Sequence, residues 1–120
     1  MGAVVGVAGL RWATAELTDA AGEVCAVAAS ELGDWEIEKL LAQSIRVASC
    51  VALGIDASGP GEAEERLSEA RSAAAALAAR VHIAVNRGTI EEATGLQVRT
   101  KIRAVVDQID MVRYRRRRAA

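Results

Sequence analysis

Arginine is concentrated near the C-terminal end of the sequence, where it favours one kind of chemistry. The segment Tyr114-Arg115-Arg116-Arg117-Arg118 places four guanidinium groups beside one aromatic ring. A planar guanidinium matches the geometry of a phosphate, and a tyrosine ring can stack on an unpaired base. The segment therefore predicts binding to the backbone of RNA or DNA.

Further basic residues precede this run on a stretch with helical periodicity. Arg99, Arg103 and Arg113 fall near one face of that helix, because they are separated by 4 and then 10 residues, whereas Lys101 falls off it. The predicted nucleic-acid-binding residues are Arg99, Lys101, Arg103, Arg113, Tyr114, Arg115, Arg116, Arg117 and Arg118. Engagement of about five of them predicts a slope of log affinity against log salt of about −3.5 for single strands.

The charge distribution along the chain supports a partner at this end. Residues 1–96 carry 7 basic and 14 acidic side chains, a net charge of −7, whereas residues 97–120 carry 8 basic and 2 acidic, a net charge of +6. A basic end of this kind is typical of a segment that binds a polyanion. Two other interpretations stay open: a frayed, solvated tail that aids solubility, and a tail that docks on the acidic surface of a neighbouring subunit or another protein.

The sequence lacks the residue patterns of an enzyme. His82 is the only histidine and Ala79 stands three positions before it, so the Glu-x-x-His pairs of a di-iron bundle are absent. Neither Cys25, Cys50 nor any serine has an assignable activating base. The glycines form neither a phosphate-binding loop nor a dinucleotide fingerprint. We expect no catalytic residue, no metal and no cofactor.

Composition indicates which elements must position these residues. Hydrophobic residues make up 52% of the chain, phenylalanine is absent and proline occurs once. Much of the hydrophobic fraction is alanine, the strongest helix former, which fills a β-sandwich poorly. The two cysteines are expected to be reduced, buried apolar residues. No signal peptide or membrane span is apparent, so a soluble protein of a reducing cytoplasm is expected.

Apolar residues recur at steps of 3 and 4 in four segments, which predicts helices near 10–31, 35–53, 62–87 and 90–113. The expected inward positions are Leu10, Ala13, Leu17, Ala20, Val24 and Val27; Ile37, Leu40, Leu41, Ser44, Val47, Ala48 and Val51; Ala63, Leu67, Ala70, Ala74, Leu77, Val81 and Ala84; and Leu96, Ile102, Val105, Ile109 and Val112. The acidic start of the third helix (Glu62, Glu64, Glu65 and Glu69) is expected to be solvated.

The breaks between the helices determine their connection. The breaks at Gly33 and Gly88 are short. Thr89 and Glu92 form a candidate capping box for the last helix. Short breaks make sequential helices antiparallel neighbours. The predicted fold is therefore all-α: an antiparallel up-down-up-down four-helix bundle, forming one domain over residues 1–120 with a basic C-terminal tail over 113–120. Trp12 and Trp35 are candidates for subunit contacts.

The order of several short motifs resembles a known family. The motifs are Leu10-Arg11-Trp12, Gln43-Ser44-Ile45-Arg46, Ala70-Arg71-Ser72 and Gly88-Thr89-Ile90, and the likeness covers about residues 10–112. They resemble the four-helix-bundle proteins encoded in intervening sequences of bacterial large-subunit ribosomal RNA genes, a family that includes the accessory variability protein of diversity-generating retroelements. The resemblance implies a homo-oligomer without enzymatic activity, commonly a ring of five bundles. In the retroelement branch it implies a basic surface that binds nucleic acid and a reverse transcriptase.

Overall fold

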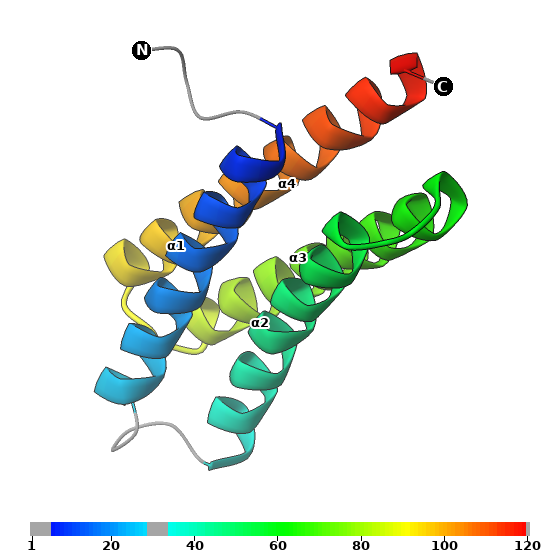
Figure 1. Cartoon of the computed structure of the whole chain (residues 1–120). Helices are drawn as coiled ribbons and strands as arrows, with labels where there is room; N and C mark the ends of the chain where they lie inside the picture. The colour runs from blue at the N-terminus through cyan, green and yellow to red at the C-terminus, as the bar shows by residue number, and fades with distance from the viewer. Residues whose placement is uncertain (1–5, 29–33, 120) are drawn as a thin grey trace.

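Four helices form the part of the chain that the computed structural model describes, residues 6–28 and 34–119, with side chains described over 7–23 and 38–118. The helices are α1 (Gly6–Ala28), α2 (Asp34–Ile55), α3 (Pro60–Asn86) and α4 (Glu92–Ala119). Each packs against the next along the chain, and α4 returns to pack against α1 (Figure 1). No strand occurs among the described residues, and the predicted four-helix bundle is confirmed.

The helix α3 supplies the most regular part of the core. All seven positions predicted to face inward on it are buried, and Leu67 and Leu77 are at most 1% exposed. Most of the others are alanines, whose small side chains let neighbouring helices approach closely. One hydrophobic cluster joins this stripe to residues from the other three helices. The prediction for α3 is therefore confirmed residue by residue.

One inward position predicted on α4 is wrong. Leu96 is 62% exposed, whereas Val98 is buried and continues the stripe formed by Ile102, Val105, Ile109 and Val112. Residues two positions apart on a helix are separated by about 200° around its axis. Leu96 and Val98 therefore cannot both face the core. The structure selects Val98 because its spacing from Ile102 matches the rest of the stripe.

The stripes on α1 and α2 are confirmed in part. Leu10, Ala13 and Leu17 are buried on α1, and Leu40, Ser44, Val47 and Val51 on α2; Ala20, Leu41 and Ala48 are only half-buried. The Ser44 hydroxyl satisfies its hydrogen-bonding need by donating to the Leu41 carbonyl at 2.9 Å. Val24, Val27 and Ile37 lie outside the described side chains, as do Cys25 and Trp35.

The turn between α3 and α4 ends the third helix where the sequence predicts. Gly88 adopts a left-handed φ of 76°. Its amide donates to the Val85 carbonyl at 2.9 Å, and the Thr89 amide donates to the Ala84 carbonyl at 3.0 Å. This is the Schellman arrangement, in which the left-handed residue is a glycine because a residue with a side chain would be strained there.

The predicted capping box at Thr89 is wrong. The Thr89 hydroxyl donates to the Ala84 carbonyl at 2.9 Å, so it closes the end of α3. The next helix starts only at Glu92, two residues after the predicted start. Gly95 in its first turn is buried against α3, and a Cβ there would lie 2.3 Å from Val85 Cγ2. The glycine thus allows α3 and α4 to converge beside the turn.

Candidate nucleic-acid interface

The basic C-terminal segment continues α4 as a helix up to Ala119. The described part of it is therefore helical. The last turn carries Arg116, Arg117 and Arg118, where positive charge is stabilised by the partial negative charge of a helix C-terminus. Figure 1 shows these turns extending past the start of α1, beside the region where α2 ends and α3 begins.

Two of the predicted arginines, Arg113 and Arg117, are held by one carboxylate. Glu64 of α3 accepts hydrogen bonds at its Oε1 from Arg113 Nε at 3.0 Å and from Arg117 Nη2 at 2.7 Å. The bonds from Arg113 and then from Arg117 lower the pKa of Glu64 to about 2, and the bond with Glu64 raises the pKa of Arg113. These two guanidinium groups are therefore already paired with an anion inside the molecule.

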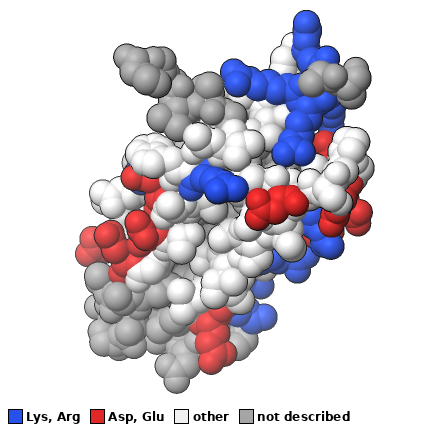
Figure 2. Space-filling model, in the orientation of Figure 1, with Lys and Arg blue, Asp and Glu red and all other residues white. Residues whose placement is uncertain are grey.

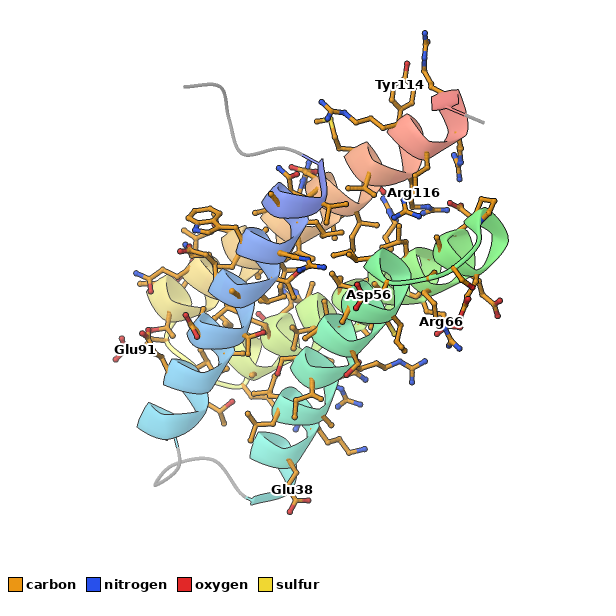
Figure 3. All side chains as sticks on the ribbon, in the orientation of Figure 1. Glu38, Asp56, Arg66, Glu91, Tyr114 and Arg116 are labelled. Carbon is orange, nitrogen blue, oxygen red and sulfur yellow. The ribbon has the colours of Figure 1, made fainter. Side chains whose placement is uncertain are left out.

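Three arginines at the same end have no carboxylate partner among the described residues. They are Arg115, Arg116 and Arg118. Arg118 donates to the Tyr114 hydroxyl at 3.3 Å and lies over that ring, 5.8 Å from its centroid. Figure 3 shows Tyr114 and Arg116 on different sides of the last turns, as expected for residues two positions apart. Basic atoms gather at this end of the molecule in Figure 2.

The remaining predicted residues lie elsewhere on α4. Lys101 forms an ion pair with Glu16 of α1, and Arg103 lies 3.6 Å from Asp107 on the following turn. Arg99 has no ion pair among the described residues. At 1.5 Å per residue, Arg99 is about 24 Å from Arg115 along the helix axis. The predicted set is therefore divided between two parts of α4.

Two aspartates separate the two parts. Asp107 stands beside Arg103, and Asp110 accepts from Arg71 of α3 at 2.8 Å. Because each carboxylate is paired with an arginine, two neutral ion pairs interrupt the positive charge of α4 between its two parts. The part near Arg99 instead borders an open, mostly apolar groove of about 630 Å³ between α3 and α4. Of these two parts of α4, the C-terminal one combines an aromatic ring with three guanidinium groups that have no carboxylate partner among the described residues.

Glu64 is a residue of the candidate site that the sequence interpretation missed. It was expected to be a solvated carboxylate in the acidic start of α3, but its side chain is 40% exposed and pairs with two arginines. Glu69 is also paired, with Arg66 at 3.4 Å. The antiparallel fold supplies a signal for the contact with Glu64, since it places the start of the third helix beside the end of the fourth.

Two other potentially reactive side chains, Cys50 and His82, lie on α2 and α3. Cys50 is a free, buried thiol, as predicted, and burial, followed by the nearby Glu69, raises its pKa. A raised pKa disfavours the nucleophilic thiolate. His82 is exposed, with its Nε2 3.2 Å from the Asn86 side-chain nitrogen. The described residues contain no group of three side chains suited to hold a metal ion.

Comparisons with known proteins add no relative to this description. The chain matches no protein-family model, and neither the curated proteins nor the solved structures give a significant match. The family resemblance noted from the short motifs therefore stays a prediction. None of the described helices combines the length and apolarity that a membrane crossing requires.

Proposed function

We propose that this protein is a non-enzymatic accessory protein that binds the phosphate backbone of RNA or DNA through the end of α4. The observation that carries the proposal is the presence of three guanidinium groups without a carboxylate partner, Arg115, Arg116 and Arg118, on one helix end. The chain as a whole has a net charge of −1, so general basicity does not account for them.

The helical arrangement suits contacts that do not depend on base sequence. Arginine donates two parallel hydrogen bonds to a phosphate, and each neutralised phosphate releases counterions. Because the arginines project from a continuous helix, less backbone freedom is lost on binding than in an unfolded tail. Tyr114 is 59% exposed and offers a surface for stacking an unpaired base.

The salt dependence of binding tests this proposal. Three engaged arginines per protomer give a slope of about −2 for a single strand and about −2.7 for a duplex. Single-strand affinity should therefore fall roughly 20-fold between about 50 mM and about 200 mM salt, with little effect of base sequence. Fluorescence anisotropy with labelled oligonucleotides measures both quantities. Binding that depends strongly on base sequence and little on salt would contradict the proposal.

An acidic protein surface is the second candidate partner, in which case the protein is a scaffold or adaptor. The contact between Glu64 and Arg117 favours it, because this end already binds one carboxylate. Competition separates the two candidates. If polyglutamate displaces a bound single strand at lower charge concentration than an unlabelled oligonucleotide does, the scaffold function is correct.

We also propose that copies of the chain assemble, as the family resemblance implies. The resemblance further implies a ring of five subunits and a reverse transcriptase as partner. Trp12 on α1 is 62% exposed, and large exposed aromatic rings are typical of interfaces. Sedimentation at micromolar concentration should show an oligomer that Trp12→Glu dissociates. Ile45→Glu is the matched control, since Ile45 is 60% exposed on α2. A monomeric wild-type protein would contradict the assembly.

A further inference from the structure

The Glu64 carboxylate lies between two arginines, Arg113 and Arg117. Its Oε1 accepts from Arg113 Nε and Nη2 and from Arg117 Nη2, so three donors converge on one anionic oxygen. Convergent guanidinium donors of this kind are also the usual arrangement around a phosphate. The carboxylate therefore uses donors that would otherwise be available to a nucleic-acid backbone.

The two arginines differ in how easily they can leave Glu64. The Arg113 side chain is only 18% exposed, so its release would disturb the packing between α3 and α4. The Arg117 side chain is 65% exposed and lies one turn later, next to the unpaired Arg116 and Arg118. It can rotate into solvent without uncovering the core. Arg117 is therefore the exchangeable partner and Arg113 the fixed one.

We propose that Glu64 is an autoinhibitory residue that withholds Arg117 from the phosphate-binding end of α4. The inference rests on the proposed function and concerns the regulation of that same site. With Glu64 in place, Arg115, Arg116 and Arg118 are the available phosphate contacts. Successive residues on a helix are about 100° apart, so these arginines surround the helix end and a strand must pass around it to meet all three. When the contact opens, Arg117 joins them as a fourth phosphate contact. An ion pair at this exposure is weak, and the affinity it withholds is about 1.5- to 5-fold.

The contact does not open by protonation at neutral pH. The hydrogen bonds from Arg113 and Arg117 lower the pKa of Glu64 to about 2, so the carboxylate stays ionised in neutral solution. The contact between Glu64 and Arg117 opens instead when a polyanion competes for Arg117 or when Glu64 is replaced by a neutral residue. This property makes substitution of Glu64 a clean test.

The decisive experiment compares Glu64→Gln with Glu65→Gln on a labelled single strand. Glu65 is the matched control because it is the next residue, is exposed and forms no ion pair among the described residues. Both variants remove one negative charge. Glu64→Gln should bind about 1.5- to 5-fold more tightly than Glu65→Gln, and its salt slope should be steeper by about 0.7, which corresponds to one additional phosphate contact.

A second measurement protects the test against a folding defect. Arg117→Ala should weaken binding more in the Glu64→Gln protein than in the wild type, a difference that a general loss of stability would not produce. If Glu64→Gln lowers the helix content, Glu64→Asp can be used instead, because it keeps the charge but has a shorter side chain. It should increase affinity and salt slope in the same direction by a smaller amount.

The outcomes distinguish the regulation from the function. If the wild type binds, and Glu64→Gln and Glu65→Gln bind with the same affinity and salt slope, the autoinhibition is overturned and the proposed function stays intact. Absence of binding by the wild type and by every variant at low salt would overturn both. Binding by Glu64→Gln alone would support a stronger inhibition than the exposure of the pair suggests.

Discussion

Replacing Leu77 by alanine should lower the free energy of unfolding by about 2–5 kcal/mol. Leu77 is 1% exposed in the middle of α3 and belongs to the hydrophobic core cluster of the described residues. The neighbouring core positions Ala73 and Ala74 have no side-chain torsions with which to fill the cavity. We therefore expect a loss in the upper half of the range, measured by urea denaturation followed by circular dichroism.

The matched control is the same substitution at Leu96. This leucine is 62% exposed on α4, so Leu96→Ala should change the free energy of unfolding by less than about 0.5 kcal/mol. Because both substitutions remove the same atoms, the difference between the two losses of unfolding free energy measures the effect of burying the leucine side chain. Similar losses at the two positions would mean that the arrangement of α3 and α4 described here is wrong.

The helical pattern predicts the fold well where one face alone is apolar. On α3 the inward stripe is unambiguous, and every predicted position is buried. On α2 the segment from Leu40 to Ile55 contains a single charged residue, Arg46, so polar residues hardly define its outer face. The pattern could not decide there that Leu40 is buried while Leu41 is only half-buried. That choice depends on packing against the neighbouring helices.

The candidate site is predictable from the sequence in part. The arginine run is visible in the residues themselves, but its division into paired and unpaired groups is not. The pairing of Glu64 with Arg117 joins residues 53 positions apart, and it depends on the relative register of two antiparallel helices. Helical periodicity fixes which face a residue occupies, not the level at which it meets a neighbouring helix. The sequence therefore overcounts the guanidinium groups available to a partner.

Replacing Arg115, Arg116 and Arg118 together by alanine should weaken binding to a single strand by about tenfold or more at low salt. These three residues have no carboxylate partner in the described structure, so their removal leaves the contacts of Glu64 with Arg113 and Arg117 intact. Alanine preserves helix propensity, and circular dichroism should show an unchanged helix content. The salt slope should approach zero.

The control for this variant is removal of the two arginines in the first half of α4. Arg99→Ala with Arg103→Ala changes the net charge of the same helix about 18 to 24 Å away from Arg115 along its axis. Arg103 already pairs with Asp107, and Arg99 lies far from the arginines at the end of α4, so the two should contribute little to binding. An equal loss of affinity in the two variants would indicate general charge attraction and not a site at the end of α4.

The most direct test of the central claim is one anisotropy titration of a labelled single strand of about 20 nucleotides at low salt. It compares the wild-type protein with the variant that lacks Arg115, Arg116 and Arg118. The structure predicts saturable binding by the wild type and a loss of about tenfold or more in the variant. No binding by the intact protein, or equal binding by both, would contradict the assignment of the end of α4 as a nucleic-acid interface.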